Sequence, residues 1–130
     1  MVGKVEELEK KVDDAYHESR NELDRAIKLQ KPILLRDACE KAWLAVVEAA
    51  NLLFAKRGIQ EAMSHSDRRE KLWKLEQEDP KLRELGIYDR VNARAFTLHI
   101  QGFYEGSVQE DSLSIELDKV KKLVEDIKAL

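Results

Sequence analysis

Residues 32–57 read PILLRDACEKAWLAVVEAANLLFAKR, and as a helix this stretch would carry apolar side chains over well over half of its circumference. A helix that is apolar on so many sides has to be contacted by neighbours on several sides, so we expect it to be the central element of the fold. Pro32 suits the first turn of a helix, and Gly58 follows Lys56 and Arg57, the usual combination at a helix end. The sequence therefore predicts a central helix from Pro32 to Arg57.

The stretches on both sides of this helix predict further amphipathic helices. Residues 2–30 place apolar side chains three and four positions apart, with Glu and Lys between them, so one face of this helix should be buried. A helical pattern runs from Ile87 to Glu105. The last helix has the cleanest periodicity in the chain, and Ser107-Val108-Gln109-Glu110 predicts a capping box at its start.

The sequence defines the helix boundaries least clearly between residues 58 and 87. Residues 59–66 are expected to form a loop with a helical start. Asp67-Arg68-Arg69-Glu70 predicts a capping box that opens a third helix, which would extend to about Gln77. Asp79-Pro80 marks a turn, and residues 81–85 predict one short turn of helix that Gly86 closes.

These elements predict an all-α fold, an antiparallel bundle of four to five helices in a single domain over residues 1–130. No stretch alternates apolar and polar residues in the way a half-buried strand does. Apolar residues make up 43% of the chain and charged residues 38%, which is enough for a core and too much charge for a membrane span. The N-terminus has no secretory signal pattern, so we expect a cytoplasmic protein with no membrane partner.

Charge and motifs exclude several classes of site. The net charge is -3, and no long segment carries more than one basic charge in excess, which disfavours strong sequence-independent binding of nucleic acid. His17, His65 and His99 lack metal-ligand spacing, and the scattered glycines form no phosphate loop, so we expect no metal and no cofactor. Cys39 is expected to be a small buried hydrophobe.

The two tryptophans, Trp43 and Trp73, lie among Leu, Ala and Val at helical spacing. Core packing is the expectation for both of them.

Arg94 and His99 are the residues most suited to chemistry. Five positions apart on an α-helix, they would lie about 140° from each other and border the same broad face. A histidine can transfer a proton near neutral pH, and an arginine can stabilise charge on a phosphoryl oxygen, so the pair fits phosphodiester cleavage without metal. Asn92 precedes His99 by seven residues and would orient the imidazole or the substrate.

Three further residues are candidates for binding. Phe103 and Tyr104 form an aromatic pair next to this segment, and Arg90 is one of the cations that the fold would gather on one side. The alternative for the catalytic pair is structural: Arg94 pairs with Asp89 or with a neighbouring helix, and His99 is a satisfied, semi-buried polar group.

The segment from Ala38 to Gly58 resembles the second helix of HEPN-type bundles, and the segment from Leu98 to Gly106, with the final helix, is similar to the archaeal PaREP branch of that group. The resemblance implies a bundle of four or five helices, dimerisation, and an association with nucleotidyltransferases or RNA. Many HEPN proteins are metal-independent ribonucleases with an arginine four to six residues ahead of a histidine, and Arg94 and His99 fit that spacing. The position after the arginine is usually polar in active members, whereas here it is Ala95.

Two functions are therefore expected. The first, which the sequence favours, is a noncatalytic helical module for dimerisation and docking of a partner such as a nucleotidyltransferase, associated with nucleotides or RNA. The alternative is a metal-independent endoribonuclease of toxin type, in which two copies of the Arg94 and His99 pair face each other across a homodimer.

Overall fold

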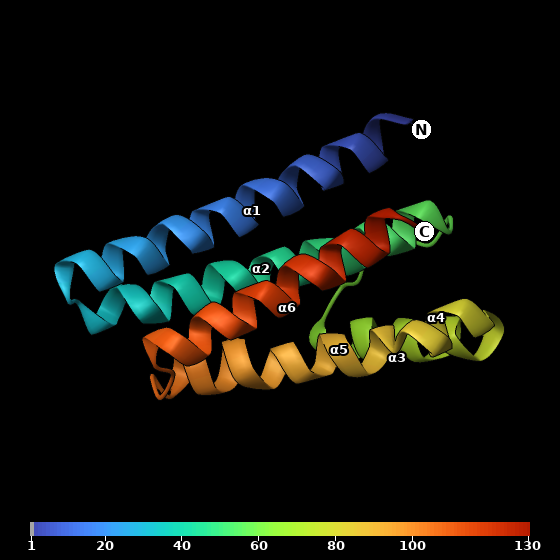
Figure 1. Cartoon of the computed structure of the whole chain (residues 1–130). Coiled ribbons are helices and arrows are strands. Elements are labelled where there is room, and N and C mark those ends of the chain that lie inside the picture. Colours follow the sequence, from blue (N-terminus) through green and yellow to red (C-terminus); the bar gives the residue numbers. More distant parts are fainter. Residues whose placement is uncertain (1) are drawn as a thin grey trace.

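The computed structural model describes residues 2–130 and contains six α-helices and one π-helix over that range (Figure 1). The helices are α1 (Val2–Leu29), α2 (Pro32–Lys56), α3 (His65–Glu78), α4 (Pro80–Leu85), α5 (Ile87–Arg94) and α6 (Glu110–Lys128). The π-helix η1 (Ala95–Tyr104) continues directly from α5. No strand occurs in the described residues, so the predicted all-α fold is confirmed.

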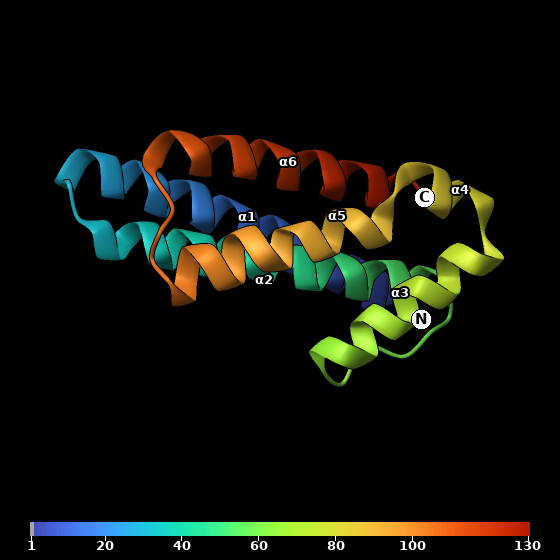
Figure 2. The same cartoon turned by 90° about the horizontal axis from the view of Figure 1, so that it is seen from below.

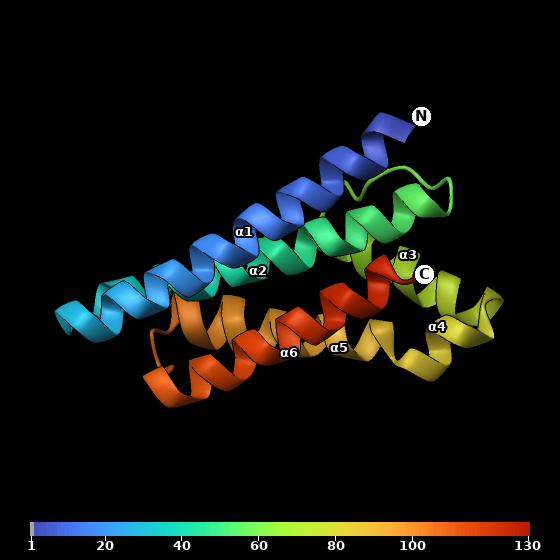
Figure 3. The same ribbon diagram turned by 45° about the horizontal axis from the view of Figure 1, so that its top comes forward.

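The long elements form an antiparallel bundle with α2 in its middle. Figures 1 and 3 show α1 running back along α2, while the joined α5 and η1 run antiparallel to α6. Helix α2 packs against α1, η1 and α6, as its apolar circumference predicted. Its fully buried side chains include Val46, Leu52, Leu53 and Phe54. None of the described helices is long and apolar enough to cross a membrane.

The boundaries of α2 follow the sequence signals. Helix α2 begins at Pro32, and Lys31 before it has extended backbone angles, as the proline requires. The helix ends at Lys56, and Gly58 adopts the left-handed conformation that commonly terminates a helix. The ammonium group of Lys56 then donates to the carbonyls of Ile127 and Lys128, which ties the ends of α2 and α6 together.

Helix α3 has its cap three residues earlier than the capping-box pattern predicted. The cap is Ser64, whose Oγ accepts from the backbone N–H of Asp67, and the Asp67 carboxylate accepts from the backbone N–H of Met63. The prediction that Asp67 opens this helix is therefore wrong, and residues 59–64 form a loop without the predicted helical start. The earlier start places His65 in the first helical turn. Figure 2 shows α3 doubling back beside α5 at one end of the bundle.

The start of α6 also differs from the prediction. Gln109 is the cap, and it forms a capping box with Ser112. Ser107 was predicted to cap this helix, but its backbone N–H and hydroxyl donate to the carbonyl of Gln101 instead. The cap lies two residues later because Ser107 is used to close the end of η1.

The segment predicted as one helix from Ile87 to Glu105 changes its hydrogen-bond pattern at Ala95. From there to Tyr104 the backbone is π-helical, and the N–H of Glu105 still donates to the carbonyl of Ile100, five residues back. Gly102 lies against α2, because a Cβ atom there would come within 2.5 Å of Sγ and 2.8 Å of Cβ of Cys39. Arg36 of α2 donates to the carbonyls of Phe103 and Tyr104 and so closes the end of η1.

Candidate functional site

A cavity with polar side chains on mainly apolar walls lies where α2, the first turn of α3 and η1 meet. Four side chains, Trp43, His65, Arg68 and His99, line two adjoining hollows. The first, which we call the η1-side cavity, has a volume of about 160 Å³ and is also lined by Arg69, Val91, Asn92, Ala95 and Ile100. The second, the α2-side groove, is more open and is also lined by Glu40, Lys41, Leu44 and Val47.

His99 is held between α2 and its own helix. Its Nδ1 donates to Oε2 of Glu40 at 3.0 Å, and its ring stacks on the indole of Trp43 with 5.8 Å between centroids. Because a carboxylate only accepts hydrogen bonds, this contact places the proton of a neutral His99 on Nδ1 and leaves the Nε2 lone pair free to accept a proton. The side chain is 19% exposed, so the imidazole borders solvent.

His65 comes from the first turn of α3 and lies beside His99, with 5.4 Å between the two ring centroids. Nη1 of Arg68 donates to Nδ1 of His65 at 2.9 Å, so the neutral His65 carries its proton on Nε2. Burial lowers the pKa of His65, and the charge of Arg68 lowers it further. His65 is therefore mostly neutral at pH 7 and presents a donor, whereas the Nδ1-protonated tautomer of His99 presents an acceptor at Nε2.

Arg68 is the most enclosed charged residue of the cavity. It is 8% exposed, its guanidinium lies over the ring of Trp43 at 5.6 Å, and its Nε is buried without a hydrogen-bond partner. Burial lowers the pKa of Arg68 and the charge of Arg69 lowers it further, whereas the charges of Glu48 and Asp67 act in the opposite direction.

Arg94 and His99 do not share this cavity. Nε of Arg94 donates to Oε2 of Glu116 on α6 at 2.6 Å and to Oγ1 of Thr97 at 3.2 Å, and Arg94 lines neither hollow. Both charged groups of this ion pair are almost fully enclosed, with side-chain exposures of 10% and 12%. Arg94 thus has the structural partner on a neighbouring helix that the alternative interpretation named. Its catalytic role stays a prediction.

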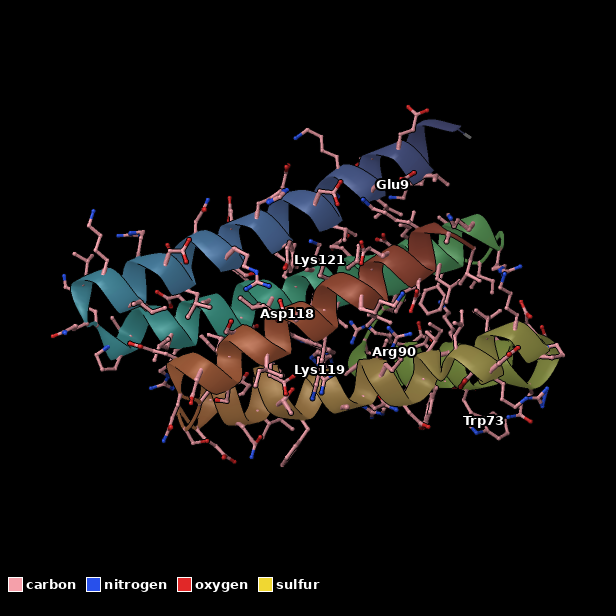
Figure 4. All side chains as sticks on the ribbon, in the orientation of Figure 1. Glu9, Trp73, Arg90, Asp118, Lys119 and Lys121 are labelled. Atoms are coloured by element: carbon pink, nitrogen blue, oxygen red, sulfur yellow. The ribbon has the colours of Figure 1, made fainter. Side chains whose placement is uncertain are left out.

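The other predicted residues are divided between the cavity and the rest of the bundle. Asn92 lines the η1-side cavity together with His99. Tyr104 contacts the His99 ring edge-on with 4.9 Å between centroids, and Phe103 stacks parallel to it, so both aromatic residues belong to the surroundings of His99. Arg90 lies away from them, between α5 and α6, where it pairs with Asp126 (Figure 4).

The sequence analysis missed four residues of the cavity, because no motif in the surrounding sequence marks any of them as a site residue. They are Glu40, Trp43, His65 and Arg68. Glu40 and Trp43 lie on α2 and the other two on α3, so only the packing of α2 against α3 and η1 brings them to His99. Trp43 is buried as expected but also forms a cavity wall. Trp73, predicted to be core, is 52% exposed and points away from the bundle (Figure 4).

The cavity therefore combines a proton acceptor, a neutral donor and fixed positive charge. Cys39 is outside this chemistry, because burial raises the pKa of its thiol to about 12. Within residues 2–130 no three side chains of His, Cys, Asp or Glu gather closely enough to hold a metal ion.

Comparison with known proteins agrees with the resemblance seen in the sequence. No curated protein and no solved structure matches the chain. The model of the archaeal PaREP1/PaREP8 family matches residues 14–124, a range that contains every residue lining the two hollows. The chain belongs to the archaeal PaREP1/PaREP8 family.

Proposed function

We propose that this protein cleaves single-stranded RNA without a metal ion, using His99 as a general base. The observation that carries the proposal is the pair of imidazoles 5.4 Å apart, one hydrogen-bonded to a carboxylate and the other to a guanidinium. Glu40 fixes the tautomer and orientation of His99, as a carboxylate does for a catalytic histidine. The proposal keeps His99 from the sequence prediction and replaces Arg94 by His65 of α3.

The reaction would proceed by attack of the ribose 2′-hydroxyl on the adjacent phosphorus. Nε2 of His99 takes the hydroxyl proton while the new O–P bond forms, and the N–H of His65 donates to a phosphoryl oxygen. The P–O bond to the 5′-oxygen of the next nucleotide then breaks, and that oxygen takes a proton from solvent water. The products would be a 2′,3′-cyclic phosphate end and a 5′-hydroxyl end.

Replacing His99 by Ala is expected to lower the rate of RNA cleavage by at least about 100-fold, because the general base is removed. The measurement is cleavage of a fluorescently labelled single-stranded RNA in EDTA, with the cyclic phosphate end identified by mass spectrometry. His17→Ala is the matched control, since His17 lies exposed on α1 and lines neither hollow of the site. Wild-type protein that leaves the RNA intact in this assay would refute the proposal.

A second function is supported by an exposed apolar stripe on η1 that borders the cavity, and it corresponds to the noncatalytic docking module that the sequence favoured. Phe96, Ile100 and Tyr104 repeat every four residues along η1 and are 53%, 43% and 64% exposed. Exposed aromatic and aliphatic side chains in one stripe are typical of a protein–protein contact. Under this proposal the stripe is the homodimer contact or the docking face for a nucleotidyltransferase.

Phe96→Ser is expected to convert a dimer into a monomer in sedimentation velocity experiments if the stripe on η1 is the dimer contact. Phe96 is 53% exposed, so this variant should keep its fold, and it lines neither hollow, so the cavity should be unchanged. Ile115→Ser is the control, because Ile115 is an exposed side chain, 58% accessible, on a different helix. A protein that sediments as a monomer at all concentrations, before any substitution, would exclude the homodimer.

A further inference from the structure

Two arginines of the chain are buried to the same degree but differ in their partners. Arg94 and Arg68 are each 8% exposed. Arg94 has the carboxylate of Glu116 at 2.6 Å, whereas Arg68 contacts the aromatic ring of Trp43 and a neutral histidine and keeps a buried Nε without a partner. A buried guanidinium without an anion is unfavourable, because its charge has lost water and gained no counter-charge. The contrast identifies Arg68 as the group without a directly paired carboxylate, since Glu48 and Asp67 act on it only through their charge.

The surroundings of Arg68 favour an anion on the η1 side. The residues that line the η1-side cavity include two arginines, two histidines and an asparagine, and no acidic residue is among those described around it. The carboxylate of Glu40 lines the α2-side groove and is hydrogen-bonded to His99. An anion in the η1-side cavity would therefore meet positive groups and the amide of Asn92 without a facing carboxylate.

The position of Arg68 and Arg69 near the N-terminus of α3 also favours a bound anion. Both lie in the first turns of a 14-residue helix, where the macrodipole is positive and cations are disfavoured. The one carboxylate in that turn, Asp67, already accepts from the backbone N–H of Met63 and pairs with Lys71 at 3.1 Å. An anion bound between the two arginines would compensate both their charge and that of the helix end.

The volume and the walls of the η1-side cavity indicate which kind of anion would fit. A volume of about 160 Å³ accommodates a small group such as a phosphate. The remaining walls, Trp43, Val91, Ala95 and Ile100, are apolar or aromatic, which suits an attached base or sugar better than a second charge. The planar fork of an arginine matches the paired oxygens of a phosphate, and a phosphate monoester also offers the second negative charge that two arginines favour.

We propose that Arg68, with Arg69 and the first turn of α3, forms a binding site for a phosphate monoester group in the η1-side cavity. The group would be carried either by a free nucleoside monophosphate or by the 5′-phosphate end of an RNA. The site does not depend on the RNA cleavage proposed above, since a phosphate monoester binds there whether or not His99 transfers a proton.

The experiment uses the full chain with Trp73→Phe, so that Trp43 is the one tryptophan left and reports on Arg68 directly. Its fluorescence is followed while AMP, inorganic phosphate or a 5′-phosphorylated RNA tetramer is added, with adenosine and the 5′-hydroxyl tetramer as uncharged-end controls. We expect saturable binding of the phosphorylated ligands that exceeds their controls at least about tenfold in affinity. Tighter binding of AMP than of the tetramer identifies a free nucleotide as the ligand, and the reverse identifies an RNA end.

Arg68→Lys keeps the charge but removes Nε and the planar fork, so affinity for AMP should fall at least about tenfold. Arg83→Lys is the matched control, because Arg83 lies exposed on α4 outside the cavity, and it should leave affinity unchanged. Thermal unfolding followed by circular dichroism establishes that each variant is folded. If Arg68→Lys does not fold, a rise in the melting temperature of the otherwise unsubstituted protein with AMP, absent with adenosine, still supports the site.

The proposal is overturned if no phosphorylated ligand gives a saturable response up to about 10 mM, or if adenosine binds as well as AMP. It is also overturned if Arg68→Lys and Arg83→Lys, both folded, bind AMP equally. Phosphate binding by a protein that leaves RNA intact in EDTA would remove the proposed cleavage reaction and keep the anion site.

Discussion

Replacing Glu116 by Ala is expected to lower the free energy of unfolding by about 3–5 kcal/mol, because it leaves the buried guanidinium of Arg94 without a counter-charge. The pair is close, at 2.6 Å, and both side chains are nearly enclosed, so water cannot replace the lost carboxylate without opening the contact between α5 and α6. Urea denaturation followed by circular dichroism measures the change. Asp118→Ala is the control: that carboxylate also pairs with an arginine, Arg20, but it is 70% exposed, and its loss should cost less than about 1 kcal/mol.

The double variant Arg94→Leu/Glu116→Leu separates structure from catalysis at this position. Replacing both partners of a buried ion pair by apolar residues is often neutral or stabilising, so most of the lost stability should return. If Arg94 serves only to join α5 to α6, the folded double variant should cleave RNA as the wild type does. A folded double variant without cleavage would show that Arg94 takes part in the chemistry, as the sequence pattern suggested. A stable Glu116→Ala variant would contradict the assigned role of the pair.

Gly102→Val is expected to destabilise the protein by about 3 kcal/mol or more, because η1 lies too close to α2 for any side chain at this position. Even a Cβ atom would come within 2.8 Å of Cβ of Cys39, an atom on the α2 backbone side that no rotamer change can move away. The two helices would have to separate, and the hydrogen bond between His99 and Glu40 spans the same contact. We therefore expect loss of RNA cleavage at a temperature where the wild type is active.

Gly3→Val is the matched control for this substitution. Gly3 lies near the start of α1, and a Cβ atom there would meet nothing within 4 Å, so the change in unfolding free energy should stay within about 0.5 kcal/mol. Both variants are compared by urea denaturation. If Gly102→Val proved as stable as Gly3→Val, the close approach of η1 to α2 would not exist in solution.

The sequence predicted those parts of the fold that local signals determine. Pro32 and Gly58 mark the ends of α2, and the apolar circumference of that helix predicted its central position, because both depend only on residues within the helix. The start of α3 was missed because Asp67 and Ser64 are both favourable N-cap residues. In the structure the Oγ of Ser64 accepts from the backbone N–H of Asp67, so Ser64 is the cap. Apolar periodicity did not distinguish the π-helix from an α-helix either, because it reports which residues are buried and not how the backbone is hydrogen-bonded.

The candidate site was only partly predictable for a related reason. His99, Asn92 and the aromatic pair that follows lie in one stretch, and the sequence identified them together. Arg94 was in the same stretch, but its direction is determined by Glu116, which is 22 residues further along the chain. His65 and Arg68 belong to a different helix. No pattern in the sequence predicts that the first turn of α3 packs beside His99.

The hydrogen-bond pattern of η1 has a consequence for how the chain length can vary. Each bond of a π-helix encloses one residue more than a bond of an α-helix, so the segment from Ala95 to Tyr104 holds more chain than an α-helix of equal length would. Deleting one residue between Ala95 and Leu98 would let the backbone relax to ordinary α-helical turns while His99 keeps its direction toward α2, because the larger rotation per residue of an α-helix offsets the lost residue. The η1 segment would thus absorb the loss of one residue by a change of helix type, without moving the side chains that face α2.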